Sequence, residues 1–206
     1  MSEPKFKTNI TKEEMEKERI VRFDELKQTG VPLMFIDSIL PGHQRMNYSY
    51  VGDTASENPD YTAAITQPHD FQIGMVKAKP GNGPAYHTHD YIEAFFPLTG
   101  QWRFYWGNSE DEIEGETIIN PWDLISLPPG LWRGFEVLSD SDEEAWLLAV
   151  LEPHKVFDGK DPHWAPQIIR QAEQYGFKAD EKGKMIPPEN FKDLEKEMDE
   201  KLNNDK

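Results

Sequence analysis

The middle of the chain alternates short apolar runs with turn-forming residues. Between about residue 20 and residue 152, β-branched and aromatic residues gather in runs of strand length, and glycine, proline and asparagine separate them. No helical pattern interrupts this region. Because many short strands without intervening helices pack as a sandwich or a barrel, we predict a single all-β domain over residues 20–152.

The N-terminal segment has a helical pattern instead. Thr11 is followed three residues later by Glu14, which is the spacing of a capping box, and helix-forming residues follow. We therefore predict a short, charged helix over residues 11–19. It belongs to an N-terminal extension, residues 1–19, that we expect to lie outside the barrel.

The C-terminal segment also changes from strand spacing to helix spacing. Residues 165–175 predict one helix that ends before Gly176, and residues 188–203 predict a second. The second helix has apolar side chains near one face, namely Phe191, Leu194, Met198 and Leu202. Residues 177–187 between them resemble a linker or an ordered loop. We expect this C-terminal helical extension, residues 153–206, to pack on the barrel or on a partner subunit.

The composition limits the chemistry and the partners. The 206 residues include no cysteine, so disulfides, thiolate ligands and iron–sulfur clusters are excluded, and a metal must be bound by imidazole, carboxylate or water. The net charge of -16 disfavours nucleic acid and anionic membranes as partners. No segment has the apolar length of a membrane span, and the first residues have no apolar leader. We expect a cytoplasmic protein that binds neither nucleic acid nor membrane.

Two histidines and a glutamate form the most informative pattern. His87 and His89 are two residues apart, so on a strand both imidazoles lie on the same face and reach one point. If Asp90 to Ile92 make a tight connection, Glu93 opens the next strand and adds a carboxylate oxygen. Two nitrogens and one oxygen suit Fe(II), Mn, Zn, Ni or Co and leave coordination positions open for a substrate.

The residues around this pattern resemble the first motif of the cupin superfamily. The motif is met at every position, by Gly81, His87, His89, Glu93 and Gly100. Pro128 and Gly130 match the turn of the second cupin motif, and the resemblance covers roughly residues 70–151. It implies a double-stranded β-helix, or jelly-roll, barrel with one divalent metal ion, and a homodimer.

The second motif departs from the family pattern at two positions. Trp122 stands where the family has glycine, and Arg133 stands where it has the fourth metal ligand, a histidine. A guanidinium offers only donors and cannot bind a cation. Three alternatives follow: a site with three protein ligands, a metal that is weak or absent, or a replacement histidine. The best placed replacement is His154, and weaker candidates are His43, His69 and His163.

Other residues are candidates for catalysis and substrate binding. We hypothesise that Arg133 binds a carboxylate or enolate of the substrate, unless it points outward or pairs with an acidic neighbour such as Asp123 or Glu136. Tyr86 and Tyr91 flank the ligands and are candidate proton donors.

The strand over residues 101–106 has two faces that both suit a pocket. One face carries Gln101, Arg103 and Tyr105, and the other carries Trp102, Phe104 and Trp106. The first would line a polar pocket, with Arg103 and Tyr105 as substrate-binding residues, and the second an apolar one. Alternation alone does not decide between them.

These residues favour an enzyme that acts on a small, oxygenated, anionic molecule. That molecule would be aromatic or diketone-like. Open coordination positions favour a non-haem Fe(II) dioxygenase. A redox-neutral isomerase, lyase or decarboxylase that uses Mn, Zn or Ni is the second class, because the same ligands permit it. A non-catalytic cupin that binds a small molecule is the third.

Overall fold

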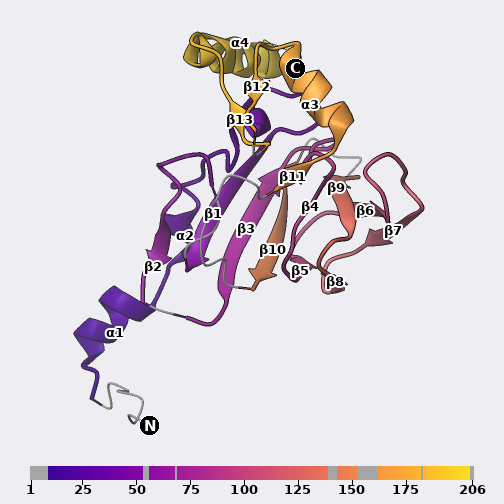
Figure 1. Ribbon diagram of the computed structural model, residues 1–206. Helices are drawn as coiled ribbons and strands as arrows, with labels where there is room; N and C mark the ends of the chain where they lie inside the picture. The colour runs from indigo at the N-terminus through magenta and orange to yellow at the C-terminus, as the bar shows by residue number, and fades with distance from the viewer. Residues whose placement is uncertain are drawn as a thin grey trace.

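The structure is a computed structural model that describes residues 9–52, 56–67, 69–138, 143–152, 162–181 and 183–204. Two β-sheets make up its body (Figure 1). The first contains β1 (Arg45–Val51), β2 (Ala63–Ile65), β3 (Gln72–Ala78), β5 (Glu93–Pro97), β8 (Ile125–Leu127) and β10 (Ala145–Leu151). The second contains β4 (His87–Thr88), β6 (Trp102–Gly107), β7 (Gly115–Ile119), β9 (Trp132–Val137) and β11 (His163–Trp164).

The strand order is that of a jelly roll. The first sheet has the order β2-β1-β3-β10-β5-β8, and the second has the order β11-β4-β9-β6-β7. Strands β3 to β10 therefore form two four-stranded halves, β3-β10-β5-β8 and β4-β9-β6-β7, whose neighbours pair antiparallel. This is the eight-stranded arrangement of cupins. The predicted all-β, double-stranded β-helix fold is confirmed.

An apolar core fills the space between the two sheets. Strand β6 contributes Trp102 and Phe104, both with 0% of their surface exposed, and β9 contributes Phe135. Strand β5 of the opposite sheet contributes Phe95, whose ring centroid lies 4.8 Å from that of Phe135. The side chains of Trp102 and Phe104 therefore face the interior, which decides the orientation that the sequence left open.

The predicted helices are present at both ends of the chain. Helix α1 (Lys12–Arg19) begins after Thr11, whose side chain forms the expected capping box with Glu14. Helices α3 (Pro166–Glu173) and α4 (Phe191–Asn204) match the two predicted C-terminal helices. Between α3 and α4, the expected loop contains a short antiparallel pair of strands, β12 (Lys178–Ala179) and β13 (Met185–Ile186).

Residues 20–44 differ from the prediction, because their apolar runs do not form strands. They contain helix α2 (Phe23–Leu26) and the 3-10 helix η1 (Phe35–Ser38), and the first strand begins at Arg45. The reason is their packing: Ile36 and Ile39 are 0% exposed and belong to a second core shared with α3 and α4. Apolar content alone did not distinguish a strand from a segment that covers helices.

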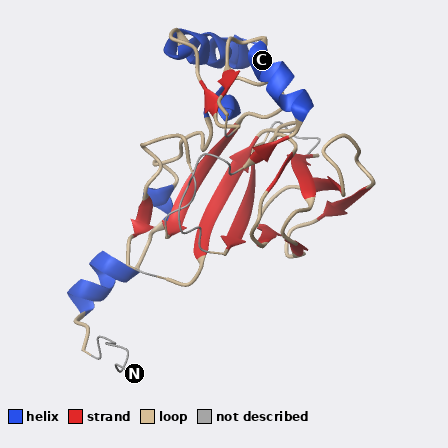
Figure 2. Ribbon diagram, in the orientation of Figure 1, coloured by secondary structure: helices blue, strands red, loops and turns tan. Residues whose placement is uncertain are grey.

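The C-terminal extension is an integral part of the molecule. Helices α3 and α4 lie together beyond one end of the sheets (Figures 1 and 2). Strand β11 pairs with β4, and the shared core joins Ile168 of α3 to Ala85 and Tyr86, which precede β4. The extension therefore supports the strand that carries His87. In the part of the chain that the structure describes, no helix has the length and apolar character needed to cross a membrane.

We predict that removing side-chain volume from this shared core destabilises the whole barrel. Ile168→Ala should lower the free energy of unfolding by about 2–5 kcal/mol, because a side chain that is 4% exposed leaves a cavity. Ile113→Ala is the matched control, since Ile113 is 51% exposed, and it should change stability by less than about 0.5 kcal/mol. Urea unfolding followed by circular dichroism measures both. Equal effects would contradict the shared core.

Candidate metal centre

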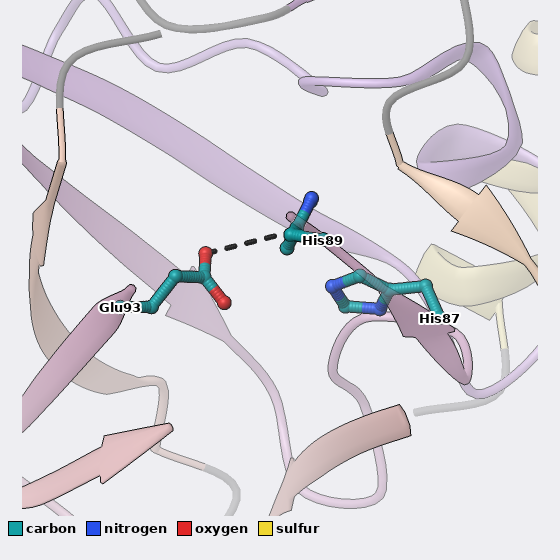
Figure 3. Close-up of side chains that lie close together, drawn as sticks. All are labelled: His87, His89 and Glu93. Atoms are coloured by element: carbon teal, nitrogen blue, oxygen red, sulfur yellow. Dashed lines mark ion pairs between the residues drawn. The ribbon is translucent and has the colours of Figure 1, made fainter. Parts of the chain in front are cut away.

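Three buried side chains converge at one end of the barrel. His87 lies on β4, His89 follows it, and Glu93 is the first residue of β5 in the opposite sheet. They are 5%, 7% and 5% exposed, and one ligand atom from each lies within 4.8 Å of the others. Figure 3 shows the two imidazoles and the carboxylate approaching one point from the two sheets. The structure thus brings the predicted ligands together.

His87 is held in the orientation and the charge state of a metal ligand. Its Nδ1 lies 2.5 Å from the carbonyl oxygen of Ala85, so Nδ1 carries the proton and Nε2 is left as the ligand atom. Burial, and then electrostatic interactions with His89 and Arg133, hold the pKa of His87 well below its usual value. Because metal binding requires a neutral imidazole, the protein has met this condition in advance.

Arg133 fixes the third ligand. Arg133 on β9 lies opposite His87 on β4 in the register of the sheet, and its side chain is 0% exposed. Its Nε and Nη2 both donate to Oε2 of Glu93, at 3.1 and 2.9 Å, while Nη1 donates to the carbonyl oxygen of Leu131 at 2.9 Å. The guanidinium thus occupies one carboxylate oxygen and leaves Oε1 for another partner.

The remaining oxygen of Glu93 faces the histidines. Oε1 lies 3.7 Å from Nε2 of His89, too far for a hydrogen bond (Figure 3). The ring of His89 stacks on Tyr91, with centroids 4.5 Å apart and an interplanar angle of 21°. A cation between these atoms would join two groups that do not bond each other directly. His87, His89 and Glu93 therefore fit a divalent metal ion in number, charge and donor type.

The ligands line a small cavity of about 60 Å³. That volume holds a few waters, at roughly 10–15 Å³ for each. Most of the wall is apolar and includes Met75, Phe95 and Leu151, and Tyr91 also lines it. The size suits a substrate with few non-hydrogen atoms better than a substituted aromatic ring.

The other candidate residues lie outside this cavity. The hydroxyl of Tyr86 donates to carbonyl oxygens of the loop between β6 and β7, those of Ser109 and Glu112. Arg103 is on the outer face of β6, where it pairs with Glu116 and Glu136. Arg133 touches Glu93 and does not line the cavity, so its partner is a ligand residue and not Asp123 or Glu136.

Tyr105 shares the outer face with Arg103. Its ring covers Gly134, where a Cβ would meet the Tyr105 ring at 2.4 Å. The guanidinium carbon of Arg103 lies 5.1 Å from the ring centroid. Burial raises the pKa of Tyr105 to about 12, which makes it a poor proton donor or acceptor near neutral pH.

A replacement for the missing histidine is not found among the described residues. His43 approaches the carbonyl oxygen of Gly83, His69 that of Gln67, and His163 is exposed on β11. None of these three lines the cavity. His154 lies outside the described residues.

Three polar residues of the cavity were missed by the sequence prediction. Arg45 and Asn47 on β1, and Tyr61 before β2, line the same cavity as the ligands. The signal was the alternation of Arg45, Asn47 and Ser49 with Met46, Tyr48 and Tyr50. Alternation places these polar residues on one face, but such a face more often meets solvent than a barrel interior.

Comparisons with known proteins add little to what the strand order shows. No family model matches the sequence, and no curated protein matches it. Among solved structures, a cupin 2 domain-containing protein from Halorhodospira halophila is similar, with 14% identity, TM-score 0.44, and coverage of 63% of this chain and 77% of that one. The chain has a cupin-type fold.

Two further structures illustrate how distant the similarity is. A structure of the DMSP lyases RdDddP and RnDddQII has 15% identity and TM-score 0.43, with coverage of 59% of this chain and 52% of that one. The capsular polysaccharide assembling protein CapF from Staphylococcus aureus has 16% identity and TM-score 0.44, with coverage of 58% and 31%. At such TM-scores the neighbours carry no information about the activity of this chain.

We predict that Arg133 controls metal affinity. Arg133→Met should weaken Fe(II) or Zn binding by about 10- to 100-fold, because Glu93 loses the contact that orients it. Isothermal titration of the metal-free protein measures the effect. Arg103→Met is the matched control, because Arg103 pairs with carboxylates on the outer face, and it should bind metal normally.

Folding and metal binding must be separated in this test. Breaking a buried ion pair costs about 3–5 kcal/mol, so thermal unfolding of Arg133→Met is measured alongside. Arg133→Lys keeps the charge without the paired donors and should fall between the wild type and Arg133→Met. A folded Arg133→Met protein with wild-type metal affinity would contradict the role of Arg133.

Proposed function

We propose that this chain is a metal-dependent enzyme, a non-haem Fe(II) dioxygenase that acts on a small, oxygenated, anionic molecule. The observation that carries the proposal is the buried set of His87, His89 and Glu93 at the wall of a cavity. Two histidines and one carboxylate on a metal with open positions are the ligands of non-haem Fe(II) oxygenases. The fold is compatible with the proposal but does not argue for it.

Each residue of the site has a separate part in the proposed chemistry. His87 presents a neutral imidazole nitrogen and His89 a second ring nitrogen, and Glu93 presents Oε1 while Arg133 holds Oε2. Tyr91 keeps the ring of His89 in place by stacking on it. A bound Fe(II) ion would supply the redox chemistry for O₂ and the Lewis acidity that polarises the substrate. The apolar wall limits the access of water to that reaction.

A redox-neutral isomerase, lyase or decarboxylase is the second candidate, and Tyr91 favours it. This phenol lines the cavity next to the proposed ligands, where it can pass a proton to or from a substrate. The same three ligands bind Zn, Mn or Ni. The two candidates differ in their need for O₂.

We predict about one metal ion per chain, bound by His87. Protein purified without a histidine tag and reconstituted anaerobically with Fe(II) should contain near-stoichiometric iron by elemental mass spectrometry. His87→Ala should lose it, because the site loses one of three ligands. His69→Ala should keep it, since His69 lies outside the cavity. Equal iron content in the two variants would contradict the site.

The metal requirement of turnover then distinguishes the two candidates. For a dioxygenase, O₂ uptake in the presence of small oxygenated acids should require iron and stop when zinc replaces it. Turnover of such acids without O₂, or with zinc, would overturn the dioxygenase and support the redox-neutral enzyme. A folded protein that binds no metal after reconstitution would overturn both.

A further inference from the structure

A second polar group lines the cavity that holds the candidate ligands. Arg45 and Asn47 extend from the same face of β1, in the first sheet, whereas His87 and His89 belong to the β4 end of the second sheet. The hydroxyl of Tyr61 lies over Gly74 in the same wall, 3.3 Å from where a Cβ on that glycine would sit. The cavity thus has the two histidines on one side, and Glu93, Arg45 and Asn47 on the sheet opposite them.

One donor of this group is buried without an acceptor, and a second makes an ion-pair contact but no hydrogen bond. Asn47 is 3% exposed, and its Nδ2 has no hydrogen-bond partner among the described residues. Nε of Arg45 is also buried without a hydrogen bond in that part of the chain, although it lies 3.2 Å from Oδ2 of Asp37. A buried donor without a partner is unfavourable, because it has lost its hydrogen bonds to water. An acceptor brought by a ligand would remove that cost.

The charges around the cavity point to the same kind of ligand. The positive charge of Arg45 is balanced by Asp37, and that of Arg133 by Glu93. The net charge of these four side chains is therefore zero. A divalent ion on the proposed ligands would therefore add positive charge that no described side chain of the cavity wall balances. In a buried site such a charge strongly favours an anion over a neutral molecule.

We propose that Arg45 and Asn47 form a carboxylate-binding subsite, and that the substrate is a small carboxylic acid with an oxygen on the neighbouring carbon. The subsite holds the carboxylate through the donors of Arg45 and Asn47. The neighbouring hydroxyl or keto oxygen faces His87, His89 and Glu93, and this second part rests on the proposed function. The cavity of about 60 Å³ favours the short 2-hydroxy and 2-oxo acids of this class.

Binding of small acids to protein loaded with zinc tests the subsite without turnover. Isothermal titration with glycolate and pyruvate should show binding at least about tenfold tighter than with glycolamide, which is neutral and otherwise similar to glycolate. Asn47→Asp keeps the shape of the side chain and adds a negative charge, and Arg45→Lys keeps the charge but loses the fork of donors. Each should weaken glycolate binding by about tenfold or more without loss of zinc.

Arg103→Lys is the matched control, because Arg103 pairs with carboxylates outside the cavity, and it should bind glycolate like the wild type. Wild-type glycolate binding in a folded Asn47→Asp protein, or equal affinity for glycolate and glycolamide, would overturn the subsite. If the wild type binds no zinc, the metal proposal fails by itself. In that case, glycolate is titrated into the metal-free protein. Binding by the wild type that is lost in Asn47→Asp would still support the subsite. No glycolate binding by the metal-free wild type would overturn the subsite.

Discussion

The ion pair between Arg133 and Glu93 is the interaction on which the candidate site depends. A buried guanidinium and a buried carboxylate each lose hydration, and they are stable inside a barrel only when they meet with good geometry. Here two donors of Arg133 share Oε2 of Glu93, and a third donor satisfies a backbone carbonyl oxygen. The pair therefore holds Glu93 in place and leaves its other oxygen directed at the histidines.

This pair gives a physical meaning to the altered second motif. A histidine at position 133 would add a fourth ligand from β9, directly across from His87. Arginine at the same position instead supports an existing ligand, which leaves the proposed site with three. A site with three protein ligands has room for a substrate that binds through two oxygens, and Arg45 and Asn47 line the same cavity.

The sequence predicted the site where local geometry decides it. Alternation along a strand is enough to place His87 and His89 on one face, and the spacing to Glu93 matches a known motif. The role of Arg133 depends on which strand pairs with β4 and which carboxylate lies beside it, and neither follows from local pattern. The sequence did not decide whether Arg103 points into the barrel or outward, because both faces of β6 carry aromatic residues.

The fold was predicted to a similar extent and for the same reason. Short strands and capped helices are local features, so a sandwich or barrel and helices α1, α3 and α4 were expected, while the jelly roll followed from the resemblance to the cupin motif. Residues 20–44 have apolar runs like those of the strand region, but these side chains pack on helices that lie far along the chain, and such packing does not follow from local pattern. Arg45 and Asn47 were missed because a polar strand face inside a barrel looks like a solvent-exposed one.

The central claim is that Arg133 holds one oxygen of Glu93 while the other oxygen, His87 and His89 bind the metal. Crystals soaked in Fe(II) without O₂, with anomalous diffraction recorded at the iron edge, test it most directly. The account predicts one strong anomalous peak bounded by His87, His89 and Oε1 of Glu93, with Arg133 still on Oε2. A peak elsewhere in folded protein, or a peak at the site with Arg133 turned away from Glu93, would contradict it.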